Sequence, residues 1–179
     1  MLKKLNNLVK SMQNGNATAF EDFYNSTYRL LYSVAYGVLR QKALAEDAVQ
    51  EAFVAIYKGM NKIDVDNYNV INYIYTVAKN KALNILKKQK THADIDDEVL
   101  INSLGDKNAA PRPCASLLDD CRKILSADEY EVVVLSQIKG FKRREIAEML
   151  GSNINTITWR YQQALKKLKK VIKEGDYEL

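Results

Sequence analysis

Apolar residues recur every three to four positions along most of the chain, which is the spacing of one face of an α-helix. Over the first half of the chain this pattern predicts helices at about residues 2–12, 17–38, 43–60 and 70–90. Gly15 interrupts the first of them, and Asn16 is suited to cap the second. With only seven Gly and two Pro, and no convincing alternation of apolar and polar residues, the sequence predicts an all-α fold.

The second half of the chain predicts two more helices between residues 117 and 137, followed by a helix, a tight turn and a longer helix over residues 141–173. Gly151 can take a positive φ and end the first of that last pair, and Asn153 can cap the second. A helix-turn-helix needs a small residue where its helices cross, a glycine four residues later and an apolar residue after the turn. Ala147, Gly151 and Ile157 supply these three.

The second helix of such a unit enters the DNA major groove. The register that buries Ile157, Tyr161 and Ala164 predicts an outward polar set that can reach bases, sugars or phosphates: Asn155, Thr158, Trp159, Arg160, Gln162 and Gln163. Residues 139–173 hold ten Lys or Arg and two Glu, a net charge of +8. A solubilising basic helix pair in a helical bundle is the alternative, but the charge and the polar set together favour DNA.

Charge is unevenly placed along the chain. The 179 residues carry a net charge of +5 with a pI near 9.0, which suits a polyanionic partner. Residues 1–90 have a net charge of +6, residues 91–126 of −3, and residues 127–179 of +2. Two basic parts therefore flank an acidic connector.

Several classes of protein are disfavoured by what the sequence holds. Cys114, Cys121 and His92 make a poor zinc set, so we expect no metal or other cofactor and two reduced thiols. No nucleophile–base pair or glycine-rich phosphate loop is evident, so an enzyme acting on nucleic acid is improbable. The N-terminal lysines precede no long apolar run, so we expect neither a signal peptide nor membrane insertion.

Two helices of the first half carry candidate binding residues. Asp47, Gln50 and Glu51 are spaced to share one polar face. In the helix over residues 70–90, tyrosines precede a series of lysines and asparagines, a combination that suits stacked bases and phosphates of a single strand. Half-buried tyrosines and lysines that complement the helix dipole explain the same pattern, and the residues alone do not separate the two interpretations.

The segment AEDAVQEAFVAIYK (Ala45–Lys58) resembles the polymerase-binding helix of bacterial RNA polymerase sigma factors, in the small two-domain extracytoplasmic-function group of the sigma-70 family. The resemblance extends over roughly residues 17–90 and 117–172. It implies that this helix docks on core RNA polymerase through Asp47, Gln50, Glu51 and Phe53.

The segment NYIYTVAKNKALNILKK (Asn72–Lys88) is similar to the promoter-melting helix of that family, with Tyr73 where the family usually has Trp. The preceding loop, Asn61–Ile71, is where the family captures a flipped base of the −10 element. The resemblance implies a −10 DNA-binding set of Tyr73, Tyr75, Lys79, Asn80, Asn84, Lys87 and Lys88.

The segment over residues 138–170 resembles the −35-reading domain of the family. Ser152, Ile154 and Trp159 depart from its usual pattern, and Trp159 bears on the promoter sequence that is read. The implied −35 DNA-binding set is Arg143, Arg144, Asn155, Thr156, Thr158, Trp159, Arg160, Gln163 and Lys166.

The predicted organisation is two small helical domains, residues 1–90 and 117–179, joined by a flexible linker over residues 91–116, the second domain being a helix-turn-helix. The expected protein is a cytoplasmic, non-enzymatic sigma factor whose partners are core RNA polymerase, promoter DNA and, by resemblance, an anti-sigma factor. A dimeric helix-turn-helix regulator that acts without core polymerase is the main alternative. That alternative gives no role to the Asp47–Gln50–Glu51 face.

Overall fold

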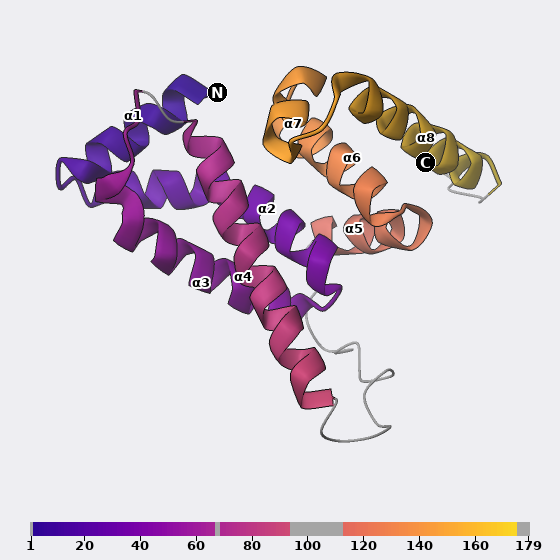
Figure 1. Ribbon diagram of the computed structural model, residues 1–179, viewed down its shortest axis with the longest axis horizontal. Coiled ribbons are helices and arrows are strands. Elements are labelled where there is room, and N and C mark those ends of the chain that lie inside the picture. Colours follow the sequence, from indigo (N-terminus) through magenta and orange to yellow (C-terminus); the bar gives the residue numbers. More distant parts are fainter. Residues whose placement is uncertain (1, 67–68, 94–112, 175–179) are drawn as a thin grey trace. The chain divides into compact units, whose positions relative to one another are not determined.

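The computed structural model describes residues 2–66, 69–93 and 113–174, and in these ranges all regular elements are helices (Figure 1). The predicted all-α fold is therefore confirmed. The chain divides into two compact units, unit 1 over Met1–Gly105 and unit 2 over Asp106–Leu179. No helix of the described ranges is long and apolar enough to cross a membrane.

Unit 1 consists of four α-helices and one short 3₁₀ helix: α1 (Leu2–Gln13), α2 (Thr18–Leu39), α3 (Lys42–Gly59), η1 (Met60–Lys62) and α4 (Val70–Ala93). Helices α2, α3 and α4 pack against one another, and α1 packs on α2, on α4 and on η1. Their common core is built from fully buried side chains that include Phe23, Leu30, Leu31, Ile56 and Ile74. The predicted apolar face of α3, from Ala45 to Ile56, is buried as expected.

The turn between α1 and α2 follows the predicted chemistry. Gly15 has φ 83°, and the Asn16 side chain accepts a hydrogen bond from the Thr18 backbone N–H at 3.1 Å. A glycine is suited to this position because side-chain-bearing residues rarely adopt such a φ. The glycine and the asparagine together end one helix and begin the next.

Unit 2 contains α5 (Pro113–Ile124), α6 (Ala127–Lys139), α7 (Arg143–Leu150) and α8 (Ile154–Glu174). Its core joins α6, α7 and α8 through Val132, Leu135, Ile146 and Ile157, all fully buried. A second cluster packs α5 against α6 and α8, with Leu125, Tyr130, Val133, Val134 and Ala164 at its centre.

Both ends of the segment predicted as a linker belong to helices. Helix α4 continues to Ala93, and α5 begins at Pro113, so residues 91–93 and 113–116 are helical. Proline is favoured at the first position of a helix because its missing N–H has no partner there in any case. Residues 94–112, on which the rest of the linker prediction falls, lie outside the described residues.

Candidate nucleic-acid interface

The turn between α7 and α8 has the geometry that the sequence predicts for a helix-turn-helix. Gly151 has φ 59°, and the Ser152 backbone N–H donates to the Ala147 carbonyl at 2.9 Å, which closes the end of α7. The Asn153 side chain then accepts the Asn155 backbone N–H at 2.8 Å and begins α8. Ile157 is fully buried and anchors the first turn of α8 against the unit.

The outward side of α8 and α7 carries much of the predicted −35 set. Trp159 is 59% exposed, an unusual position for a large aromatic side chain. Asn155, Lys166 and Arg144 are exposed as well, whereas Thr156, Thr158 and Gln163 are half-buried. Arg143 is exposed but its guanidinium lies 5.1 Å from the centre of the Tyr161 ring, a cation–π contact that fixes its direction.

Arg160 does not face outward as predicted. Its side chain is only 27% exposed, and Nη2 lies 2.7 Å from Oδ2 of Asp128 on α6. The reason is its register: Arg160 is three residues after Ile157 and four before Ala164, so it lies at the edge of the buried face. An acidic residue at the start of α6 then draws the guanidinium inward.

A second ion pair joins α8 to the beginning of α6. Lys167 Nζ lies 2.7 Å from Oε2 of Glu129, which is buried. Glu129 also forms a capping box with Ser126: the Ser126 N–H donates to Oε2 at 2.9 Å, and the Glu129 N–H donates to Oγ at 3.3 Å. Burial would raise the pKa of the Glu129 carboxyl, but the hydrogen bonds from Lys167 and Ser126 outweigh it and hold that pKa below its ordinary value.

The predicted polymerase-binding face on α3 is partly as expected. Asp47, Gln50 and Glu51 are all exposed, and Glu51 Oε2 lies 3.1 Å from Nζ of Lys81 on α4. Phe53 is different, since it is 5% exposed and its ring packs against those of Phe20, Phe23 and Tyr24. A residue two positions after Glu51 lies on the opposite side of the helix, so Phe53 stabilises α3 and does not face a partner.

The exposed side of α3 also carries two apolar side chains that were not predicted to lie there. Val54 is 54% exposed and follows Gln50 by four residues and Glu51 by three, so all three share one side of α3. Tyr57 is 57% exposed and its ring contacts that of Phe20 on α2. The spacing contained this information, but the predicted face was drawn from Asp47, Gln50, Glu51 and Phe53 alone, and neither Val54 nor Tyr57 was considered.

The predicted −10 set on α4 separates into a buried part and an exposed part. Asn80, Asn84, Lys87 and Lys88 are exposed, as binding to DNA requires. Tyr75 is only 3% exposed, so its ring is part of the core and cannot stack on a base without a rearrangement. Lys79 Nζ lies 3.1 Å from the Tyr75 hydroxyl and 5.5 Å from its ring centre, and is held there at the edge of the core.

Tyr73 is half-buried and lies over the end of α3. A Cβ on Gly59 would lie 2.5 Å from the Tyr73 hydroxyl oxygen, closer than real Cβ contacts come. Gly59 therefore leaves the space that the tyrosine occupies at the start of α4. The nearby Tyr68 lies outside the described residues.

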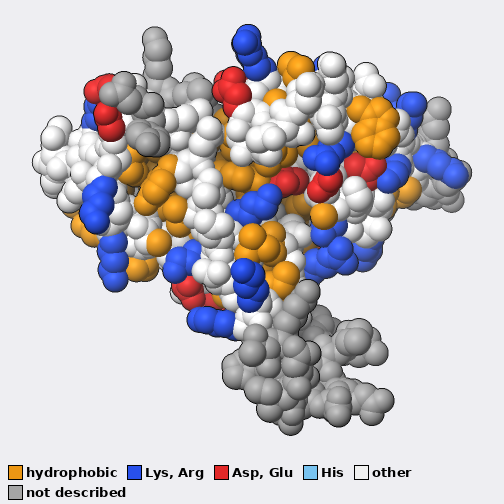
Figure 2. All heavy atoms as spheres, viewed as in Figure 1, with side chains coloured by type: hydrophobic (Ala, Val, Ile, Leu, Met, Phe, Trp, Pro, Cys, Tyr) orange, Lys and Arg blue, Asp and Glu red, His pale blue; other side chains and the backbone are white. Residues whose placement is uncertain are grey.

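On the face of each unit that Figure 2 shows, basic and hydrophobic side chains are interspersed. Among the residues that the structure describes, no group of three or more His, Cys, Asp or Glu side chains could hold a metal ion. Cys121 is a free thiol. Burial raises the pKa of this thiol, and the negative charge of the nearby Asp120 raises it further.

These features define a helical, two-unit DNA-binding protein whose second unit is a helix-turn-helix. Residues 23–92 match the family model for sigma-70 region 2, and residues 116–168 match that for sigma-70 region 4. The two matches occur in the expected order and together cover most of the chain. The chain belongs to the sigma-70 family, in its extracytoplasmic-function (ECF) group, and is a transcription initiation factor.

Relatives agree with this assignment over nearly the full length of the chain. The chain is 26% identical to the ECF RNA polymerase sigma factor SigW of Bacillus subtilis, covering 97% of this chain and 98% of the relative. It is 25% identical to the RNA polymerase sigma factor CarQ of Myxococcus xanthus (96% and 99%), and 22% identical to the ECF sigma factor SigK of Mycobacterium ulcerans (92% and 91%).

Two solved structures share the fold. The structure of CnrH in complex with the cytosolic domain of CnrY has a TM-score of 0.68 and 20% identity, covering 97% of this chain and 99% of the other. The sigma factor RpoE of Bartonella quintana, in complex with the anti-sigma factor NepR, has a TM-score of 0.65 and 22% identity, covering 86% and 96%. The helical architecture is therefore that of known sigma factors.

Proposed function

We propose that unit 1 docks on core RNA polymerase through the exposed face of α3 and contributes α4 to the capture of the melted −10 strand, while α8 of unit 2 reads the −35 element. The observation that carries the proposal is the Asp47–Gln50–Glu51 face. It is fully outside the core of unit 1, and a helix-turn-helix regulator that acts alone has no use for it.

On α4 the proposal is supported by the exposed Asn80, Asn84, Lys87 and Lys88, which place amides and ammonium groups along one helix beside the half-buried Tyr73. Ammonium groups neutralise phosphates, and an aromatic ring can stack on an unpaired base. Because Tyr75 is buried, we assign the stacking role to Tyr73 and not to Tyr75.

On α8 the proposal assigns −35 contacts to the exposed Asn155, Trp159 and Lys166, with Arg144 of α7 on the phosphates. Arg160 would have to leave Asp128 to reach DNA, so we assign it to the positioning of α8. Trp159 has a flat apolar face and no hydrogen-bond acceptor, which suits a thymine methyl group or a sugar.

The deciding experiment is competition for core RNA polymerase by Asp47→Lys with Gln50→Lys, a pair that leaves the Glu51–Lys81 contact in place. We expect the double variant to compete at least tenfold less well than the wild type, with an unchanged melting temperature. Glu21→Lys with Asn25→Lys makes the same change in charge at exposed positions of α2 and is the matched control. Equal competition by all three proteins, or a chain that binds promoter DNA as a dimer without polymerase, would contradict the proposal.

We propose further that an anti-sigma factor controls this protein, which would then work in the cytoplasm beside DNA and polymerase. The support is the similarity to RpoE, which was solved in complex with NepR. Co-purification of the chain from its own cells, followed by identification of a partner that blocks binding to core polymerase, tests this control. A chain that is always recovered with core polymerase and with no inhibitory partner would contradict it.

A further inference from the structure

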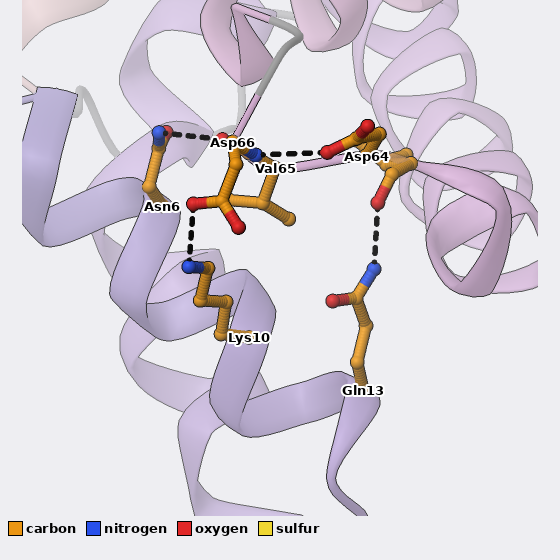
Figure 3. A network of polar contacts seen from close by, with 7 residues as sticks. Asn6, Lys10, Gln13, Asp64, Val65 and Asp66 are labelled. Atoms are coloured by element: carbon orange, nitrogen blue, oxygen red, sulfur yellow. Dashed lines mark hydrogen bonds and ion pairs between the residues drawn. The ribbon is translucent and has the colours of Figure 1, made fainter.

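Helix α1 makes a set of polar contacts with the segment that leads from α3 to α4 (Figure 3). Gln13 Nε2 donates to two backbone carbonyls of this segment, to Met60 at 2.8 Å and to Ile63 at 2.9 Å. Both hydrogens of a single amide group are therefore used to hold η1 and the residue that follows it.

Two more side chains of α1 continue these contacts along the segment. Asn6 Nδ2 donates to the Val65 carbonyl at 3.1 Å, and Lys10 Nζ forms an ion pair with Asp66 at 2.6 Å. Asn6, Lys10 and Gln13 are spaced four and three residues apart, so they lie on one face of α1, and all three contact the segment (Figure 3).

Apolar packing fixes both sides of this contact. Leu5, Val9 and Met12 attach α1 to the body of unit 1, each no more than 6% exposed. On the other side, the Val65 side chain is 4% exposed, so the segment has its own anchor in the core. The side chains of α1 thus connect two parts that are already attached to the same core.

The segment over residues 60–66 has one short helix and no ladder of its own, so its carbonyls need partners from elsewhere. It leads to Asn69, whose carbonyl accepts the first backbone N–H groups of α4, from Asn72 and Tyr73. The backbone groups that Gln13 and Asn6 hold, from Met60 to Val65, thus lie a few positions before the first turn of α4, which carries Tyr73.

From these contacts we infer that α1 is a positioning element for −10 base capture, with Gln13 as its principal residue and Asn6 and Lys10 in support. This inference rests on the proposed function of unit 1 and extends it, because α1 lies outside the segment that matches sigma-70 region 2. A base that leaves the duplex loses its pairing and stacking, and a pocket that is already ordered spends less of its binding energy on ordering itself.

The contacts differ in their expected weight. Gln13 is partly buried and satisfies two carbonyls, whereas the Lys10–Asp66 pair is exposed on both sides and is screened by water and salt. We therefore expect Gln13→Glu to have the largest effect, because it replaces both donors by an anion facing two carbonyl oxygens. Gln13→Ala removes the donors without adding charge, and Lys10→Ala should change base capture less than about twofold.

The test uses the full chain with core RNA polymerase. Open complexes are first selected from promoter DNA randomised across the −10 region, which gives the most enriched base and its position. Binding of a single-stranded non-template oligonucleotide that carries this base is then compared with binding of the same strand abasic at that position. The ratio of the two affinities reports base capture alone, since a smaller folded fraction lowers both affinities equally.

Wild type should prefer the base-containing strand by about tenfold or more, the range expected for one stacked base. Gln13→Glu and Gln13→Ala should bring this ratio to within about threefold of one, with unchanged binding to core polymerase. Asn14→Asp, which adds the same charge at the same end of α1 next to a residue that contacts the segment, should keep the wild-type ratio. It controls for the effect of charge on the helix dipole.

If both Gln13 variants keep the wild-type ratio, α1 is part of the core and nothing more, and this inference is wrong while the proposed function stands. If the wild type itself shows no preference at any position, unit 1 does not capture a base. The proposed −10 function is then wrong, and this inference, which rests on it, is wrong as well. The behaviour of the wild type thus separates the two failures.

Discussion

The two units stabilise their helix contacts by different means. In unit 1 the helices meet through large apolar and aromatic side chains, and the ion pairs Lys10–Asp66 and Lys81–Glu51 lie at its surface. In unit 2 the apolar core is smaller, and Glu129 is the one buried charged side chain among the described residues of the whole chain. Its partner Lys167 is on the helix proposed to read DNA.

This difference indicates that the two units respond to different conditions. The stabilisation that comes from buried apolar surface changes little between acid and neutral pH. A carboxylate held by hydrogen bonds contributes its full stabilisation only while it is ionised. Unit 2 also places its charged contacts, Arg160–Asp128 and Lys167–Glu129, between α6 and the helix proposed to read DNA. The stability of unit 2 therefore depends on charged contacts made by the helix proposed to read DNA, whereas the ion pairs of unit 1 lie at its surface.

The largest expected effect comes from equal truncation of the two cores. Leu30→Ala in α2 and Ile157→Ala in α8 each remove similar volume from a fully buried site, at a cost of about 2–5 kcal/mol. A unit the size of unit 2 has a core that rarely supplies more than about 3–5 kcal/mol. We expect Ile157→Ala to abolish the melting transition of unit 2, and Leu30→Ala to lower but preserve that of unit 1. Calorimetry of the full chain, with hydrogen exchange to assign each transition, measures this, and a surviving unit 2 transition in Ile157→Ala would contradict it.

A smaller effect is expected for Glu129→Gln, which removes the charge that Lys167 contacts. The loss should be about 1.5 kcal/mol, the lower end for a hydrogen bond to a charged group. Because the folded-state pKa of Glu129 is lowered, its contribution is complete above its unfolded pKa and is lost as pH falls through the lower folded value. Wild-type unit 2 should therefore lose stability below about pH 4.5, the ordinary value, and the variant should lose less over the same range. Melting temperatures at pH 7 and pH 3 for both proteins provide the check, and parallel pH dependences would exclude Glu129 as the cause.

Gly59→Ala tests the contact between α3 and Tyr73 in unit 1. The added methyl group meets the tyrosine hydroxyl at 2.5 Å, so we expect Tyr73 to move and promoter opening to decrease. Stability should change by less than about 1 kcal/mol, since alanine restricts the unfolded chain and offsets the clash. Tyr73→Phe removes the hydroxyl and leaves the ring carbon at 3.7 Å, so the double variant should recover the opening rate of Tyr73→Phe alone. Additive defects in permanganate footprinting would show that the two residues act separately.

The smallest effect on stability is expected for Trp159→Ser, because the side chain is more than half exposed. The free energy of unfolding of unit 2, followed through its melting temperature, should change by no more than about 0.5 kcal/mol. The −35 sequence selected from randomised promoters should shift. Val171→Ser, at an exposed apolar position of α8 outside the proposed −35 set, is the matched control and should leave the selected −35 sequence unchanged. An unchanged −35 preference in Trp159→Ser, together with a lower melting temperature, would assign Trp159 to packing instead of DNA.

Much of the fold could be predicted from local patterns. Helical periodicity located the elements, and Gly15, Asn16, Gly151 and Asn153 act at the turns where their conformational freedom or capping ability places them. These effects operate within a few residues of the chain, so they can be read from the sequence alone.

Side-chain direction at the edge of a buried face was less predictable. Arg160 was expected to face outward, but its direction depends on Asp128, which lies on another helix and is 32 residues away along the chain. Phe53 and Tyr75 were included among binding residues because the resembled motifs contain those positions, although both side chains are buried. The contacts of Gln13 with residues 60–63 could not be predicted because a donor on one helix carries no sign of which distant carbonyls need it.

The exposed position of Trp159 also has a spectroscopic consequence. It is the only tryptophan of the 179 residues, so indole fluorescence of the whole protein arises from one point on the outward side of α8. An indole in contact with water emits at longer wavelength and is open to collisional quenchers, and both properties change when a surface covers it. The protein therefore carries a natural optical reporter for whatever binds that helix, with no label attached and with no contribution from tryptophan in unit 1.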